Sequence, residues 1–147
     1  HYCHTALMWA SKNGYLEIVS LLLDRGANVN DQDNENNTAL IYASRNDHID
    51  ALVLLLDRGA NVNHPDEDGE TALMWASNNG HLDIVSLLTS VQNLNTLDEN
   101  QLDTLFNTDP YFLTNISKNY SKKAFHYFLN KYALLLKLPK DVVYAIF

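Results

Sequence analysis

The chain has a single cysteine and no long apolar stretch, and these absences exclude two classes of protein. Cys3 is the one cysteine among 147 residues, so an internal disulfide framework cannot form. No apolar run reaches the roughly 18 residues needed to span a membrane, and the N-terminus lacks the basic-then-apolar pattern of a signal peptide. With 46% hydrophobic residues, the chain can still bury a core. We therefore expect a folded protein of a reducing, cytoplasmic compartment.

Basic residues are scarce in the first two thirds of the chain. Residues 1–96 hold 13 acidic and 4 basic side chains, a formal charge of −9, whereas residues 97–147 hold 5 and 6, a charge of +1. Nucleic acids and anionic membranes both require Lys and Arg side chains near their phosphates, so we expect neither as a partner. The acidic surface is compatible with a protein partner that has a basic segment. The alternative is that it only keeps the chain soluble.

Signatures of catalysis and of metal binding are also lacking. The sequence contains no serine elbow, no phosphate-binding glycine loop and no zinc-ligand pair. The acidic run DEDGE, Asp66–Glu70, does not have the alternating oxygen ligands of a calcium loop. His1, Cys3 and His4 form one short cluster without a second half. We expect no enzyme activity within this chain, no cofactor and no metal, and leave open a catalytic domain in a longer parent protein.

What the chain does contain is a repeat with a period of 33 residues. The stretch TALMWASKNG at residues 5–14 returns as TALMWASNNG at residues 71–80, and TALIYASRN at residues 38–46 lies midway. Residues 71–88 match residues 5–22 at 15 of 18 positions, and LLLDRGANVN occurs twice, 33 residues apart. Repeats of this length cannot bury their apolar faces alone, so the pattern predicts a stack of similar units.

Each unit is predicted to contain two helices and a projecting loop. Thr5 is placed to cap the first helix, and Gly14 to end it in the left-handed conformation. The second helix has apolar residues at helical spacing, among them Leu16, Val19 and Leu23. The polar segment ANVNDQDNENN then reads as a loop or extended hairpin that projects from the stack.

These features resemble ankyrin repeats: the period, the T-x-L-x-x-A helix start and the G-A-x-V-N exit. The resemblance implies an all-α solenoid with repeats at about residues 1–32, 33–65 and 66–96. The family's usual Thr-Pro-Leu-His start is changed here, and we expect Met8, Ile41 and Met74 to replace the histidine by apolar packing. Asp47 stands where the other units have glycine, a left-handed position that Asp tolerates at some cost.

Residues 97–147 are predicted to form a helical C-terminal segment that closes the solenoid. ISKNYSKKAFHYFL at residues 116–129 aligns with residues 10–23, which indicates a degenerate fourth repeat at about residues 109–137, followed by a cap helix. LPKDVVYAIF at residues 138–147 also resembles the opening of an F-box, a ubiquitin-ligase adaptor motif.

By resemblance, ankyrin repeats bind partners through the hairpin tips and the concave face of the first helices. The candidate contact residues of this chain lie on those two surfaces: Trp9, Lys12, Asn13, Tyr42, Arg45, Asn46, Trp75, Asn78 and Asn79 on the first helices, and Glu35, Glu67, Asp68 and Glu70 at the tips. The alternative for the aromatic row is packing between repeats, and the alternative for the acidic tip is simple solvation.

Two asparagines match a modification pattern of the family. Asn30 and Asn63 stand at the V-N exit with a leucine eight residues before them, as in ankyrin substrates of asparaginyl hydroxylases. The acidic residue usual two positions before is Asn here, and the alternative is that both side chains hydrogen-bond the hairpin backbone.

The resemblance implies a monomeric protein–protein interaction module. An alternative is a substrate-recruiting or regulatory module of a larger enzyme, or of a secreted effector that acts in a host cytosol, as bacterial or viral ankyrin proteins do. A third interpretation is a ubiquitin-ligase adaptor.

Overall fold

The computed structural model describes residues 4–95, which form six α-helices. They are α1 (Ala6–Lys12), α2 (Leu16–Asp24), α3 (Ala39–Arg45), α4 (Ile49–Asp57), α5 (Ala72–Asn79) and α6 (Leu82–Asn95). No strand occurs within this range, so the predicted all-α class is confirmed. The predicted fourth repeat, cap helix and F-box-like segment lie outside the described residues.

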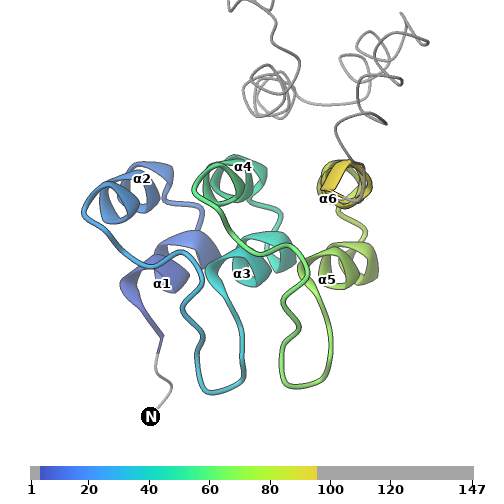
Figure 1. Cartoon of the computed structure of the whole chain (residues 1–147), viewed down its shortest axis with the longest axis horizontal. Helices are drawn as coiled ribbons and strands as arrows, with labels where there is room; N and C mark the ends of the chain where they lie inside the picture. Colours follow the sequence, from blue (N-terminus) through green and yellow to red (C-terminus); the bar gives the residue numbers. More distant parts are fainter. Residues whose placement is uncertain (1–3, 96–147) are drawn as a thin grey trace, which may run out of the picture. The chain divides into compact units, whose positions relative to one another are not determined.

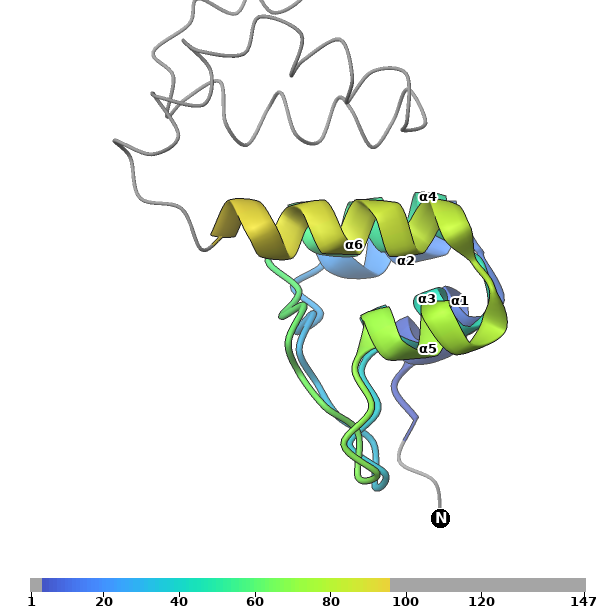
Figure 2. The same cartoon turned by 90° about the vertical axis from the view of Figure 1, so that its right-hand side faces the viewer.

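The helices form two layers with hairpins projecting from one of them. Helices α1, α3 and α5 lie side by side in the first layer, and α2, α4 and α6 form the second (Figure 1). Helix α1 packs on α3 and α3 on α5, while α1 and α3 each pack on the second helix of their own repeat. The two connecting hairpins extend beyond the first layer, away from the second helices (Figure 2). This is the helix–turn–helix solenoid that the 33-residue period predicts.

Each first helix is capped at its N-terminus by a threonine, as the sequence predicts. Thr5, Thr38 and Thr71 have extended backbone, and their hydroxyls accept the N–H of the residue three positions later at 3.2, 3.3 and 3.4 Å. This bond satisfies one of the N–H groups that a helix start leaves free. In the first repeat, the sulfur of Met8 accepts the Thr5 N–H in return, at 3.4 Å.

Each first helix is followed by a residue in the left-handed conformation. Gly14, Asp47 and Gly80 have φ of 70°, 61° and 74°. Asp47 adopts this left-handed conformation although it lacks the backbone freedom of glycine. Its carboxylate lies 3.7 Å from Nδ1 of His81 in the next repeat. The chain therefore reverses in the same way in all three repeats.

The core lies between the layers and between successive repeats. Its buried apolar residues include Val19, Leu52, Leu55 and Ile84. The prediction that Met8, Ile41 and Met74 all pack as apolar residues is right for the first two, which are buried, and wrong for Met74, which is 47% exposed.

The neighbouring helices explain why the burial of this position differs between repeats. Met8 and Ile41 belong to α1 and α3, each of which has the first helix of a following repeat packed against it. Helix α5 is the first helix of the third repeat, and within residues 4–95 no fourth repeat follows to pack against it. Burial at this position therefore depends on a following neighbour more than on the unit's own sequence.

We expect Gly14→Ala to destabilise the protein more than Gly80→Ala. Both substitutions place a Cβ on a left-handed residue, which costs roughly 1–2 kcal/mol. At Gly14 the new Cβ would also lie 2.5 Å from Nδ1 of His48, whereas at Gly80 it meets no atom within 4 Å. Moving the His48 ring breaks the 3.1 Å hydrogen bond from its Nε2 to the Lys12 carbonyl. Urea unfolding should show an additional loss of about 1 kcal/mol for Gly14→Ala; equal losses would contradict this account.

Candidate interaction surface

Both hairpins are built around an aspartate carboxylate. Oδ1 of Asp33 accepts the N–H groups of Glu35 and Asn37 at 2.9 and 2.8 Å. Oδ1 of Asp66, one period later, accepts those of Asp68 and Glu70 at 3.0 and 2.8 Å. These bonds close each tip into a tight turn, in which a left-handed residue, Asn36 or Gly69, occupies the same position.

The second carboxylate oxygen of each aspartate binds an aromatic residue of the first helix. The hydroxyl of Tyr42 donates to Oδ2 of Asp33 at 2.6 Å, and Nε1 of Trp75 donates to Oδ2 of Asp66 at 2.7 Å. Both aspartates are buried, as is Tyr42, while Trp75 is half-buried. The hairpin is thus fixed to the helix that follows it. Tyr42 has little surface to offer a partner, whereas Trp9 is 53% exposed.

The hydrogen bond between Asp33 and Tyr42 shifts the pKa of both groups. Burial alone would raise the pKa of Asp33, but the bonds from the Tyr42 hydroxyl and from the Asn37 and Glu35 N–H groups outweigh it. The pKa of Asp33 is therefore held below its usual value of 3.8. Burial, followed by the bond to the Asp33 carboxylate and its negative charge, raises the pKa of Tyr42. Asp33 is therefore ionised and Tyr42 neutral at pH 7.

Two cations lie along the aromatic row. The guanidinium of Arg45 stacks 3.7 Å from the Trp75 ring centre and lies 5.8 Å from that of Tyr42. Its Nη2 is 3.9 Å from the Asp66 carboxylate, so Arg45 connects α3 to the next hairpin. Nζ of Lys12 lies 5.7 Å from the Tyr42 ring centre, and this side chain is exposed. Asn78 occupies the equivalent position in the third repeat and is also exposed.

The predicted contact residues Asn13, Asn46 and Asn79 serve the ends of first helices. The side-chain amides of Asn13 and Asn46 donate to the carbonyls of Trp9 and Tyr42, each at 2.8 Å. Asn79 instead donates to the carbonyl of Arg45 in the preceding repeat, at 3.2 Å. Each of these carbonyls also accepts another hydrogen bond, from the N–H of Asn13, the N–H of Asn46 and Nε2 of His81, respectively, so the asparagine amides add a second donor at the helix ends. All three asparagine side chains are nevertheless exposed.

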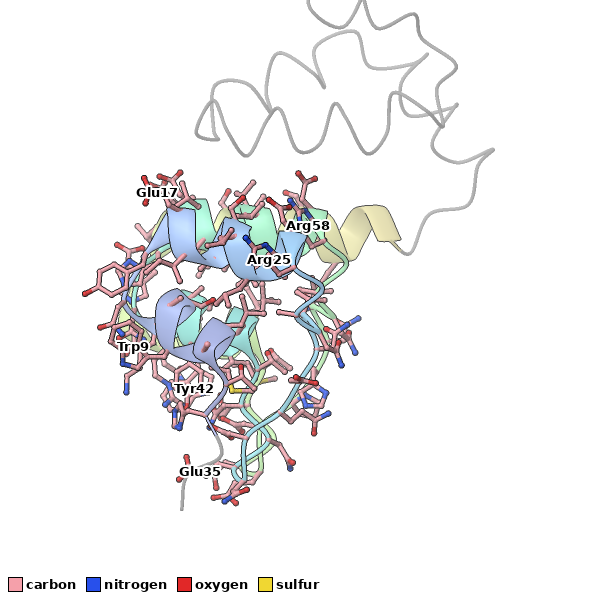
Figure 3. The ribbon with its side chains drawn as sticks, turned by 90° about the vertical axis from the view of Figure 1, so that its left-hand side faces the viewer. Trp9, Glu17, Arg25, Glu35, Tyr42 and Arg58 are labelled. Atoms are coloured by element: carbon pink, nitrogen blue, oxygen red, sulfur yellow. The ribbon has the colours of Figure 1, made fainter. Side chains whose placement is uncertain are left out.

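The predicted acidic residues lie at the far end of the hairpins from the helices. Glu67 and Asp68 are exposed, while Glu35 and Glu70 are partly exposed (Glu35 is labelled in Figure 3). Within residues 4–95, none of these four carboxylates forms a salt bridge. The N–H of Glu67 donates to the carbonyl of Glu35 at 2.9 Å, which joins the two tips. The tips therefore present neighbouring acidic side chains to solvent.

Asn30, one of the two predicted hydroxylation sites, bridges two repeats. Its Oδ1 accepts the N–H of Asn61 at 2.8 Å, and its Nδ2 donates to the carbonyl of Gly59 at 3.2 Å. These bonds provide a structural reason for an asparagine at this exit. Asn63 stands at the equivalent exit of the second repeat, where its N–H donates to the side chain of Asn61 at 3.0 Å. Hydroxylation at both sites stays a prediction.

Sequence reasoning missed the structural role of Asp33 and Asp66. The sequence shows Asp66 only as the first residue of an acidic run, but its carboxylate is enclosed by the hairpin and bound to Trp75. The signal was present in the sequence: both aspartates precede the aromatic residue of the next helix by nine positions, 33 residues apart. Among residues 4–95, no cluster of ligating side chains fits a metal ion, and no helix has the length and apolarity to cross a bilayer.

Comparison with known families agrees with this architecture. The model described as ankyrin repeats (3 copies) matches residues 2–66, and that described as ankyrin repeats (many copies) matches residues 46–89. The chain belongs to the ankyrin-repeat family, whose repeats are generally protein–protein interaction modules and typically non-catalytic. Comparison with curated proteins gives no match.

We expect Tyr42→Phe to destabilise the protein most at neutral pH. Removing the hydroxyl deprives a buried carboxylate oxygen of its shorter hydrogen bond and leaves it the 3.4 Å bond from the Asn37 amide, which should cost about 1.5–3 kcal/mol at pH 7. Because the folded pKa of Asp33 is lowered, the stability it contributes is present above its usual pKa and lost as pH falls through the folded value. The difference between native chain and variant should therefore shrink as the pH falls below 3.8, the usual pKa of this carboxyl group.

Urea unfolding at several pH values measures this difference. Tyr15→Phe is the matched control, since Tyr15 is exposed and should tolerate the change at every pH. A Tyr42→Phe effect that does not vary between neutral and acid pH would show that the carboxylate is not the cause.

Proposed function

We propose that this module binds a partner protein through its hairpin tips and the adjoining face of the first helices, and that the partner presents a basic segment. The observation that carries the proposal is the group of tip carboxylates of Glu35, Glu67, Asp68 and Glu70. The hairpins that carry them extend beyond the helices (Figure 2), and the four carboxylates form no salt bridge within residues 4–95.

The first-helix face supplies the remainder of the surface. Asp33 holds Tyr42, and Asp66 holds Trp75 and Arg45, so this part of the face is rigid before binding. A rigid surface loses little conformational entropy on association. The side chains that differ between repeats and reach solvent, Lys12 and Asn78, are proposed to distinguish between partners, together with Trp9 at the end of the row.

Charge complementarity gives this surface its proposed selectivity. Four neighbouring carboxylates attract Lys and Arg side chains over distances of about 8–10 Å at physiological ionic strength. Such pairs at the rim of an interface mainly raise the association rate and select the partner. Affinity is then expected to fall as salt concentration rises.

We expect neutralisation of the tips to weaken partner binding. The test variant combines Glu35→Gln, Glu67→Gln, Asp68→Asn and Glu70→Gln, and leaves Asp66 unchanged because its carboxylate holds the hairpin. The control removes four exposed carboxylates of the second helices: Glu17→Gln, Asp50→Asn, Asp57→Asn and Asp83→Asn. Both variants change the net charge equally, so a difference between them reports position rather than total charge.

Partners captured by the native chain from a eukaryotic lysate would be identified by mass spectrometry and their affinities measured with each variant. We expect the tip variant to lose about tenfold or more in affinity and the control to lose little, with the loss diminishing at high salt. A partner that binds all three proteins equally would move the contact away from the tips, to Trp9, Lys12 and Asn78.

A further inference from the structure

The first repeat exposes an apolar surface at the N-terminal end of the stack, which we call the end face. It consists of Trp9 on α1, Tyr15 in the turn, and Ile18 and Leu21 on α2. Their exposed fractions are 53%, 45%, 43% and 51%, respectively. The Trp9 and Tyr15 rings contact each other, with their centres 5.3 Å apart. Figure 3 views the stack from this end. The terminal repeat of a soluble solenoid normally has a polar outer surface, so these four residues are unusual there.

The equivalent side chains one and two repeats later are all less exposed. Ile84 and Leu87 of the third repeat correspond to Ile18 and Leu21, and both are fully buried. In the second repeat, Ala51 and Tyr42 correspond to Ile18 and Trp9 and are also buried, where α2 and α1 pack on α4 and α3. The end face is thus the surface on which a repeat receives its preceding neighbour.

The polar half of the same interface is also present and unoccupied in the first repeat. Arg58 donates to the Asp24 carboxylate of the preceding repeat at 2.7 Å. Asn30 of that repeat accepts the N–H of Asn61 and donates to the Gly59 carbonyl. In the first repeat, the groups equivalent to Arg58, the Asn61 N–H and the Gly59 carbonyl are Arg25, the Asn28 N–H and the Gly26 carbonyl. Arg25 is exposed (Figure 3). Within residues 4–95, no carboxylate pairs with Arg25.

We propose that the end face binds a further ankyrin repeat of the same polypeptide, immediately N-terminal to the first repeat described here. That repeat would supply an aspartate to Arg25 and an asparagine to the Asn28 N–H and the Gly26 carbonyl. Its two helices would cover Trp9, Ile18 and Leu21, as α1 and α2 cover the second repeat. The proposed interface is the same as the one that the chain already forms between its own repeats, placed one repeat closer to the N-terminus.

A second copy of this chain is a poorer occupant. The face it would have to present is that of the third repeat, which has Ser90 and Thr96 at the positions of Asp24 and Asn30. Neither residue provides the carboxylate for Arg25 or the paired donor and acceptor of an amide. The proposed occupant is therefore a repeat that has Asp and Asn at these two positions, as the first and second repeats do.

The test adds one repeat to the chain. A copy of residues 1–33 is joined before His1, which places the added Asp24 at the same 34-residue spacing from Arg25 that separates Asp24 from Arg58. Ile18 and Leu21 of the added copy are changed to Glu and Lys, so that the new end is less apolar than the original one. The control carries the same extension together with Ile18→Asp in the original repeat. A second pair of variants, Asp24→Asn in the added copy and Arg25→Gln, separately and together, tests the ion pair.

Thermal unfolding and amide hydrogen exchange are the readouts. We expect the extension to raise the Tm by about 5 °C or more and to slow exchange throughout α1 and α2. The control should lose most of this gain, and the effects of Asp24→Asn and Arg25→Gln should be non-additive. An extension that fails to fold, or that changes neither Tm nor exchange, would overturn the proposal. So would a native chain that sediments as a dimer and becomes monomeric with Ile18→Asp, since the occupant would then be a second copy.

Discussion

The carboxylate at the base of each hairpin is the contact on which the candidate surface depends. Asp33 and Asp66 each accept two backbone N–H groups with one oxygen and an aromatic donor of the next helix with the other. A buried carboxylate is costly unless it is hydrogen-bonded, so the hairpin and the helix must stay together to satisfy it. This requirement turns a polar loop of about five residues into a rigid projection, which is what a binding tip needs.

Stacking is specified by groups that recur at the repeat period and face in one direction. His48 and His81 each reach the end of the preceding first helix, at the carbonyls of Lys12 and Arg45. Asn30 bridges to the second repeat with both an acceptor and a donor. In most of these bonds the later repeat donates and the earlier repeat accepts, whereas Nδ2 of Asn30 donates to the Gly59 carbonyl of the later repeat. The polarity of the stack follows, since the two ends of a repeat are chemically different.

The sequence predicts what is internal to a unit far better than what depends on a neighbour. Threonine caps, left-handed positions and helical spacing act within a few residues, and the helices occur where these features place them. Met8 and Met74 are the same residue at the same position, yet one is buried and the other is exposed. Their difference lies in the helix packed beside them. The role of Asp66 was likewise hidden, since a run of carboxylates has the same letters whether it is solvated or enclosed.

The recurring positions of this chain are therefore mostly committed to its own structure. The asparagines that end the first helices bond helix carbonyls, the aromatic row from Tyr42 onward binds hairpin aspartates, and Asn30 joins two repeats. Apart from the exposed Trp9, the side chains proposed to meet a partner are those that vary: Lys12 against Asn78, and the tip residues Glu35, Glu67, Asp68 and Glu70. A repeat protein can change its partner through such positions without disturbing the interface that each unit must form with the next. We propose that the acidic character of the tips is the feature of this chain that its partner recognises.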